Sequence, residues 1–257
     1  MSPSQHVIDL AALAGTCDTS AGSGAGAACS RARAHGAARL SAALGAARLA
    51  CFPTDTVYGV GGLCRPAVLE ALWQTKGRDP GKPLQVVFSS LPVLFAALDP
   101  EPALAAALRR LLPGAVTAVV PSPPGFAGPP PGRDRDGAPT LGVRVPAWPR
   151  RALPMSWLAT PLVATSANPA GRPAPRRLDD VDAELRAACD LLLDGGEVGA
   201  ETGGLPSTVI DLTQLVADGA WRVLRPGAVS AASVERALGP SAGVSPRTGV
   251  AEPGAGM

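Results

Sequence analysis

Histidine and lysine are scarce in this 257-residue sequence, and each scarcity narrows its chemistry. The two histidines, His6 and His35, precede the segment that we expect to fold, so a Ser-His-Asp or Cys-His catalytic set is excluded from that segment. A histidine-rich metal site is excluded on the same ground. Both lysines, Lys76 and Lys82, flank Arg78 in one short segment, and arginine supplies the rest of the 23 basic residues.

Cysteine and aromatic residues are also few. The five cysteines are irregularly spaced and form no C-x-x-C pair, so we expect neither a disulfide framework nor a structural zinc site. Small buried thiols in a reducing compartment are the expected alternative. Aromatic residues make up 4% of the chain and the formal net charge is +2, which is too close to neutral to indicate a nucleic-acid partner.

Long apolar runs are missing: no stretch of 18 or more apolar residues is free of charges and helix breakers, so we expect no membrane span. Residues 1–36 are rich in Ala, Gly and Ser, which is typical of a disordered extension and also of a targeting segment. We therefore expect a cytoplasmic protein, or one directed to a mitochondrion or another organelle. Residues 239–257 are rich in Gly, Pro and Ser, and we expect a disordered C-terminal tail there.

Helical and strand patterns alternate over residues 37–238, which favours one α/β domain with a central sheet that is partly antiparallel. The spacing predicts helices over residues 37–49, 67–76, 102–112, 179–189 and 231–238. It predicts strands over residues 49–52, 83–88, 115–120, 141–146, 161–167, 191–194, 207–212 and 221–226. Residues 121–139 are crowded with Pro and Gly, and we expect a loop that is a candidate flap.

Polar residues and glycines gather at several expected ends of helices and strands, where ligand sites of α/β sheets commonly form. PTDTVYGVGG (53–62) places Thr54 at a strand exit, and taken alone this segment favours a turn with a structural role. KGRDPGKP (76–83) gathers three cations at a helix exit. A solvated helix cap and an anion clamp both account for that second segment.

Other candidate residues follow further along the chain. ATSANPAG (164–171) places Ser166 and Asn168 at a strand end, where a plain Asx or Ser turn is the alternative. Arg144 lies in an otherwise apolar strand and needs an acidic partner or a ligand carboxylate. Three more candidates lie in or beside expected strands: Thr117, Ser207 and Arg225.

In this order, the motifs resemble those of the YrdC-like family, the threonylcarbamoyl-AMP synthases. The resemblance extends over residues 49–227, and the KPL after KGR makes the chain look closer to the eukaryotic members. It rests on PTDTVYG (53–59), KGR (76–78) followed by SAN (166–168), PGAVT (113–117), GVRVP (142–146), STVID (207–211) and VLRPG (223–227).

The resemblance implies a single twisted mixed α/β sheet with a concave, positively charged cavity. It implies an L-threonylcarbamoyladenylate synthase, a nucleotidyltransferase that uses L-threonine, bicarbonate or CO2, and ATP, and releases pyrophosphate. The product would serve threonylcarbamoyladenosine modification of tRNA at position 37. A separate tRNA threonylcarbamoyl transferase complex would be the partner, and direct contact with tRNA would be weak.

The resemblance also implies roles for individual residues. Four would form the adenylation site and contact the nucleotide: Lys76, Arg78, Ser166 and Asn168. Two further nucleotide contacts would be Thr117 and Arg225. Three side chains would bind threonine: Thr54, Arg144 and Ser207. A Mg2+ ion bridging phosphate oxygens is implied, with few protein ligands and no residue named for it.

Two other functions stay open at this point. The first is a non-catalytic module that binds double-stranded RNA on its concave surface, which the low net charge and few aromatic residues disfavour. The second is a carbamoyl-adenylate-forming domain with another acceptor, as YrdC-like domains serve in hydrogenase-maturation proteins. Val87 stands where some family members carry a histidine, which puts any histidine role in doubt.

Overall fold

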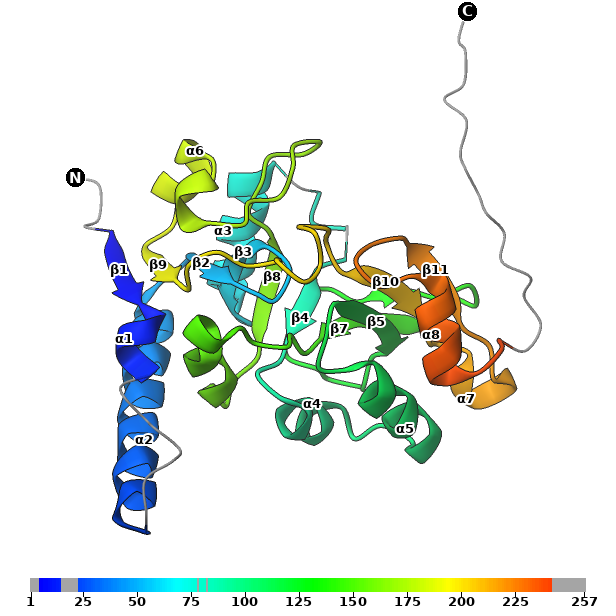
Figure 1. The fold of residues 1–257 in the computed structure, drawn as a ribbon. Helices are drawn as coiled ribbons and strands as arrows, with labels where there is room; N and C mark the ends of the chain where they lie inside the picture. The colour runs from blue at the N-terminus through cyan, green and yellow to red at the C-terminus, as the bar shows by residue number, and fades with distance from the viewer. Residues whose placement is uncertain (1–4, 15–22, 78, 82, 242–257) are drawn as a thin grey trace, which may run out of the picture.

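One mixed β-sheet organises this protein in the computed structural model, which describes residues 5–14, 23–77, 79–81 and 83–241 (Figure 1). Its described strands are β1 (His6–Asp9), β2 (Ala50–Pro53), β3 (Tyr58–Leu63), β4 (Gln85–Val87), β5 (Val116–Pro121), β6 (Gly132–Arg133), β7 (Pro139–Arg144), β8 (Leu162–Ser166), β9 (Leu191–Asp194), β10 (Thr208–Asp211) and β11 (Arg222–Arg225). The strand order is β1-β9-β2-β3-β8-β4-β7-β5-β10-β11, and β6 pairs with β7.

Parallel and antiparallel pairs alternate irregularly across this sheet. The β1–β9, β2–β9, β4–β7 and β5–β10 pairs are parallel. The β2–β3, β3–β8, β4–β8, β5–β7 and β10–β11 pairs are antiparallel. The expected α/β domain with a mixed sheet is therefore confirmed.

The helices cover the sheet and its edges. The described α-helices are α1 (Leu10–Ala14), α2 (Ser23–Ala46), α3 (Pro66–Lys76), α4 (Leu91–Leu98), α5 (Pro102–Leu111), α6 (Ala183–Ala187), α7 (Leu215–Asp218) and α8 (Ala231–Leu238). Two 3₁₀ helices, η1 (Arg150–Trp157) and η2 (Leu178–Asp180), complete the set. Among the described helices, none combines the length and the apolar character needed to cross a membrane.

The core beneath β5 and β7 explains why these two strands form. Their alternate residues are apolar and buried, and they pack against α4, α5 and α8. In α5, the apolar residues recur at helical spacing on one face, with Pro102 in the first turn. Figure 1 shows α4 and α5 below the strands β4, β7 and β5. The opposite face of these strands is left for the site described below.

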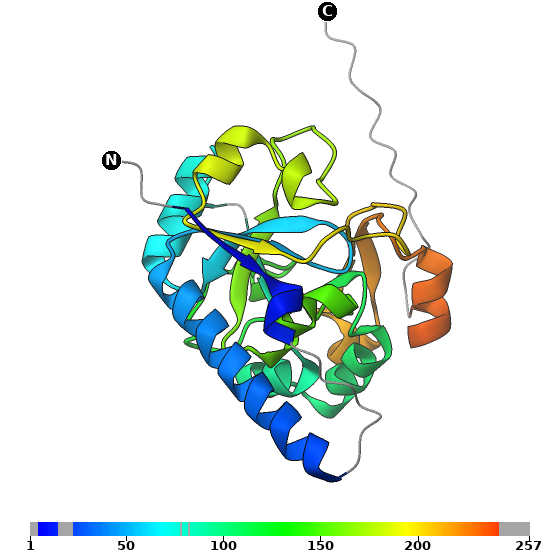
Figure 2. The same cartoon turned by 60° about the vertical axis from the view of Figure 1, so that its left-hand side comes forward.

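The N-terminal part of the chain belongs to the same body. Strand β1 pairs with β9, and Leu10 and Leu13 of α1 are buried in one cluster with Leu40 and Leu44 of α2. Helix α2 runs along one side of the molecule and extends past the rest of it (Figure 2). Described residues of the expected 1–36 extension are therefore structurally part of the domain expected to begin at residue 37. A targeting role for that extension stays a prediction.

The structure differs from the sequence-based expectations in several elements. The helix expected over residues 37–49 begins at Ser23 and ends at Ala46, and α4 was not predicted. The glycine-rich segment after Val57 was expected to be a turn but forms β3. At Gly61 a Cβ would lie 1.9 Å from the carbonyl oxygen of Val163, so close pairing with β8 requires glycine there. The stretch 121–139 is mainly loop, apart from β6 and the first residues of β7.

Candidate functional site

A cavity of about 380 Å³ lies on the face of the sheet opposite α4 and α5. Strands of the sheet form the floor of the cavity, and every second residue of a strand points toward it. Along β7, Thr140, Gly142 and Arg144 line the cavity, whereas Leu141 and Val143 point into the core. The neighbouring strands contribute further lining residues at the same spacing: Thr117 and Val119 from β5, and Ser207 and Val209 from the start of β10.

Strand registers divide the cavity into two ends. Gln85 of β4 is level with Gly142 of β7 and with Ala164 of β8. Pro83 precedes β4, Thr140 precedes Gly142 on β7, and Ser166 ends β8, and all three line the cavity beyond that level. We call this part of the cavity the Ser166 end. We call the other part the Arg144 end, with Thr54, Thr117 and Arg144. Thr140 and Arg144 are four residues apart on β7, which corresponds to roughly 13 Å.

Arg144 is a buried charge, with only 2% of its surface exposed. Its Nη2 atom forms an ion pair with Asp55 Oδ1 and donates a hydrogen bond to Thr56 Oγ1 at 2.7 Å. Asp55 Oδ2 accepts a further bond from the Ala147 backbone N–H at 3.0 Å. Burial lowers the pKa of Arg144, and the Asp55 carboxylate opposes that shift. The Nε atom of Arg144 is buried and has no partner among the described residues.

The turn between β2 and β3 presents Asp55 and Thr56 to Arg144. Thr54 Oγ1 donates to the Val57 carbonyl at 2.7 Å and lies 3.2 Å from Thr56 Oγ1. A loop after β9 packs against this turn. Gly199 in that loop has φ +74°, and a Cβ there would lie 2.1 Å from the Thr56 carbonyl oxygen. Only glycine fits this position without moving the turn.

Hydroxyl groups and a second arginine lie near Arg144. Thr117 Oγ1 donates to Gln85 Oε1 at 3.0 Å, so Ser207 Oγ is the donor in the 2.8 Å bond between Ser207 and Thr117. Arg225 Nη2 donates to the Ser207 carbonyl at 2.8 Å. Burial lowers the pKa of Arg225, and the positive charge of Arg144 lowers it further. The two arginines are therefore close enough to repel each other, and an anion between them would be stabilised.

At the Ser166 end, Lys76 ties helix α3 to the turn that follows β8. Its Nζ donates to the Ser166 carbonyl at 3.0 Å and to the Asn168 carbonyl. Gly77, at φ +54°, caps the helix directly after Lys76, so the capping interpretation holds for this glycine. The Asn168 amide donates to the Arg172 carbonyl, and its Oδ1 is buried with no partner within the described part of the chain.

The structure thus places eight of the nine candidate residues. Six line the cavity together: Thr54, Thr117, Arg144, Ser166, Ser207 and Arg225. Lys76 and Asn168 join it through the Ser166 turn rather than by lining it. Arg78 lies outside the described residues, as does Lys82, so its place in the site stays a prediction.

Sequence reasoning missed several residues of this site. Asp55 was within reach, because it stands inside the PTDTVYG motif and Arg144 was expected to need an acidic partner. Gln85 gave no signal, since one glutamine at a strand start is unremarkable without its neighbours. Arg133 lines the cavity from β6, but its sequence surroundings indicate only a loop.

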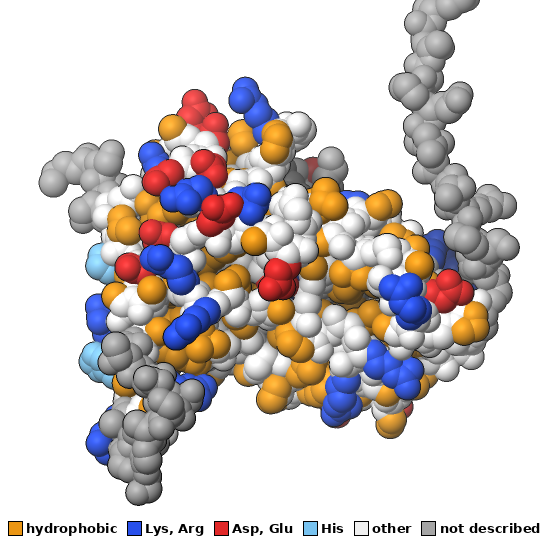
Figure 3. Space-filling view, in the orientation of Figure 1, with side chains coloured by type: hydrophobic (Ala, Val, Ile, Leu, Met, Phe, Trp, Pro, Cys, Tyr) orange, Lys and Arg blue, Asp and Glu red, His pale blue; other side chains and the backbone are white. Residues whose placement is uncertain are grey.

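The charged side chains among the described residues of the cavity lining are all basic. They are three arginines, Arg133, Arg144 and Arg225, and none is Asp or Glu. On the face drawn in Figure 3, by contrast, basic and acidic side chains are mixed at the upper left. In the described ranges of the chain, nowhere do three or more His, Cys, Asp or Glu side chains gather as metal ligands would.

Comparisons with known proteins show which family this chain resembles in sequence and in fold. The Sua5/YciO/YrdC family model, described as "Telomere recombination", matches residues 42–227. A threonylcarbamoyl-AMP synthase of Bacillus subtilis (strain 168) is 31% identical over 205 residues, which cover 79% of this chain and 56% of that protein. The crystal structure of Pyrococcus abyssi Sua5 complexed with L-threonine aligns with a TM-score of 0.64 at 30% identity, over 79% of this chain and 58% of that one. This chain therefore spans slightly more than half the length of these two relatives.

A structure of Escherichia coli YciO shows the same fold. It aligns with a TM-score of 0.60 over 76% of this chain and 91% of the YciO chain. The identity is 20%, so this likeness concerns the fold alone.

Proposed function

Because this chain belongs to the Sua5/YciO/YrdC family, we propose that it makes threonylcarbamoyl-AMP from L-threonine, bicarbonate or CO2, and ATP. The product is the activated intermediate for threonylcarbamoyladenosine modification of tRNA at position 37. The observation that carries the proposal is a single cavity in which buried Arg144 and a set of hydroxyl groups meet the turn held by Lys76.

Threonine is proposed to bind at the Arg144 end. The Nη2 group of Arg144 is occupied by Asp55 and Thr56, but its Nε–H has no partner among the described residues. A ligand carboxylate would satisfy such a buried donor, which is costly to leave unpaired. The hydroxyls of Thr54 and Ser207 would serve the polar groups of the same ligand.

ATP is proposed to bind between Arg225 and the Ser166 end. Lys76, Arg78, Ser166 and Asn168 would form the adenylation site, and Thr117 and Arg225 would add contacts to the nucleotide. Lys76 donates hydrogen bonds to two carbonyl groups of the Ser166 turn. It would therefore position Ser166 and Asn168 as well as supply a positive charge near the phosphates. A positively charged cavity, as the lining arginines suggest, would favour the phosphates.

Magnesium is treated as a companion of the nucleotide. The described residues offer no cluster of metal ligands, so they do not fit a resident magnesium centre. The Mg2+ would therefore enter with ATP as part of the substrate, held by phosphate oxygens and water.

In the proposed reaction, the main task of the protein is to position the substrates relative to one another. The threonine amine adds to CO2 and gives a carbamate. A carbamate oxygen then forms a bond to the α-phosphorus of ATP, while the bond from that phosphorus to the bridging oxygen breaks and pyrophosphate leaves. Cations near the phosphates stabilise the charge that develops, and enclosure protects the labile product from water.

Pyrophosphate release from purified protein tests the proposal. Release should require ATP, threonine and bicarbonate together, and labelled bicarbonate should appear in the adenylate product. Lys76→Ala and Arg78→Ala should each abolish release, while Arg236→Ala, which changes an exposed residue of α8, should not. Arg144→Ala should raise the KM for threonine more than the KM for ATP. RNA binding without any adenylate would instead support the non-catalytic module.

Finer assignments belong to the same proposal. The likeness to eukaryotic members rests on the KPL sequence, and a bacterial relative at 31% identity matches this chain as well. A cytoplasmic or organellar location and a separate tRNA threonylcarbamoyl transferase complex as partner also stay predictions. Immunolocalisation of the tagged full chain, and affinity purification with it, would test both.

A further inference from the structure

Arg133 is a cavity arginine to which the motifs above assign no role. It lies on β6, which pairs with the start of β7 so that Arg133 is opposite Pro139 and Gly132 is opposite Thr140. Thr140 belongs to the Ser166 end, so Arg133 lines the same end of the cavity. A Cβ at Gly132 would lie 3.1 Å from Pro83 Cγ, which places β6 directly against the segment that follows Lys76.

The side chain of Arg133 is exposed, and most of its N–H donors have no partner within the described part of the chain. Its Nη1 donates to the Gly137 carbonyl at 2.9 Å, across the turn that joins β6 to β7. A guanidinium has five N–H donors in a planar fork, which matches two oxygens of a phosphate group. The bond to Gly137 orients the side chain and leaves donors for a ligand.

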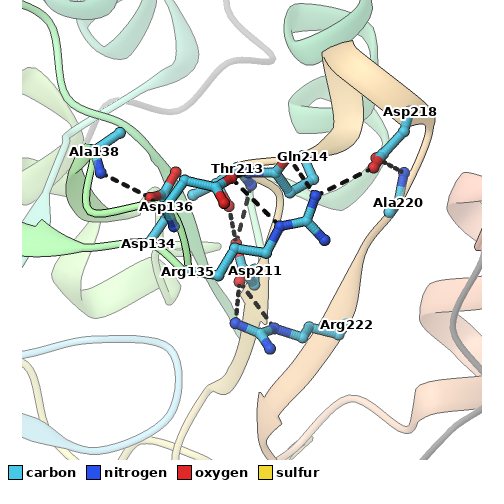
Figure 4. Close-up of polar contacts among 10 residues, drawn as sticks. All are labelled: Asp134, Arg135, Asp136, Ala138, Asp211, Thr213, Gln214, Asp218, Ala220 and Arg222. Carbon is cyan, nitrogen blue, oxygen red and sulfur yellow. Dashed lines mark hydrogen bonds and ion pairs between the residues drawn. The ribbon is translucent and has the colours of Figure 1, made fainter.

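The turn after Arg133 has a fixed shape. Asp134 Oδ1 accepts bonds from the backbone N–H groups of Asp136 at 2.9 Å and Ala138 at 2.8 Å. Gly137 adopts φ +82°, which closes the turn. Figure 4 shows these bonds on one side of a larger network of polar contacts.

The same turn is attached to the C-terminal part of the sheet. Arg135 Nη2 donates to Gln214 Oε1 at 3.0 Å and forms an ion pair with Asp218 at 3.5 Å. Gln214 Nε2 donates back to Asp136 Oδ2 at 3.4 Å. Figure 4 shows Arg135 pointing from the β6–β7 turn toward Gln214 and Asp218. This attachment holds the strand that carries Arg133 over the Ser166 end.

We infer that Arg133 binds the β- and γ-phosphates of ATP and the pyrophosphate that leaves. The inference rests on the proposed function and deepens it. Threonine bound at the Arg144 end would bring its carbamate to the α-phosphorus from that side. Because the attacking and leaving oxygens lie roughly in line, the pyrophosphate must point away from Arg144, toward the Ser166 end. Arg133 and the Lys76 segment border that end from two sides.

The test is a comparison of nucleotide affinities by isothermal titration calorimetry, using full-length protein with ATP, AMP and pyrophosphate as probes. In Arg133→Gln, affinity for ATP and for pyrophosphate should fall about tenfold or more, as expected for one lost charge-assisted contact. Affinity for AMP should change less than about twofold, because AMP lacks both distal phosphates. Arg133→Lys should recover part of the ATP affinity, since it restores the charge without the fork.

Arg236→Gln is the matched control, because it removes an exposed arginine that lies outside the cavity and, among the described residues, donates one hydrogen bond, to Ser233 Oγ at 2.8 Å. It should leave all three affinities unchanged. Unchanged ATP affinity in Arg133→Gln, or equal losses for ATP and AMP, would overturn the inference while the proposed function stands. A wild-type protein that neither binds ATP nor releases pyrophosphate would overturn the proposed function together with the inference.

Discussion

Replacing Asp55 by Ala is expected to lower the free energy of unfolding by about 3–5 kcal/mol, because it leaves a buried guanidinium without its counter-charge. The side chains of Arg144 and Asp55 are only 3% and 9% exposed, so water compensates poorly for the lost carboxylate. Thr56 Oγ1 would remain as an acceptor for Arg144, but a neutral hydroxyl offsets little of the charge. Arg144→Met should lower the free energy of unfolding by a similar amount, because it leaves the Asp55 carboxylate buried without its counter-charge.

The double variant Asp55→Ala/Arg144→Met decides whether the two charges act as a unit. It removes both, so its loss should be smaller than the sum of the single losses by about 2 kcal/mol or more. The free energy of unfolding of all three variants is measured by urea titration with tryptophan fluorescence as the signal. The dependence of that free energy on urea concentration should be the same in every variant. Arg48→Ala is the control, because its ion pair is 68% exposed on the arginine side and should contribute at most about 1 kcal/mol. Additive losses in the double variant would refute the reasoning.

Two further predictions concern the loop after β9 and the buried thiols. Gly199→Ala should lose about 1–3 kcal/mol more than the control Gly203→Ala, since both have positive φ but only Gly199 abuts the Thr56 carbonyl. Equal losses in urea would contradict this account. Burial raises the pKa of Cys64 and Cys189 from 9.0 to about 12, so the folded state keeps protons that the unfolded state releases above pH 9.0. The free energy of unfolding should therefore fall as pH rises from 9.0 toward about 12, and a Cys64→Ala/Cys189→Ala variant should show a smaller fall.

Elements with a strong local signal could be predicted from the sequence. Helix α5 has apolar residues at helical spacing and ends before Pro113, and it was expected within one residue of its true bounds. The strands β9 and β10 were also expected where they lie. In each case, the pattern that folds the element is contained in the element itself.

Elements that depend on distant partners could not be predicted. Strand β3 contains Gly59, Gly61 and Gly62, which locally favour a turn, and only close approach of β8 makes them suitable for a strand. Strand β1 is stabilised by pairing with β9, about 180 residues away, so nothing beside it in the sequence marks it as a strand.

The candidate site divides in the same way. Its hydroxyls and Arg144 could be predicted because they interrupt apolar strands with polar side chains. Their convergence depends on the order of strands in the sheet, which no local pattern contains. Arg133 could not be predicted, because its place in the cavity lining depends on pairing between β6 and β7 and on the attachment of the turn through Arg135.

Side chains of the central strands alternate between the two faces of the sheet. One face packs the apolar core that folds the protein, and the other face lines the cavity. On the face toward α4 and α5, Leu141 and Val143 are buried without charge, and the sheet could bury an apolar pair at Arg144 and Asp55 as well. Replacing a buried ion pair by apolar residues is often neutral or stabilising, so stability alone does not account for these charges. The Nε–H of Arg144, which has no partner among the described residues, adds a further cost that a bound ligand would remove. A double variant that keeps most of its stability but loses threonine-dependent release of pyrophosphate would show that the pair serves binding rather than folding.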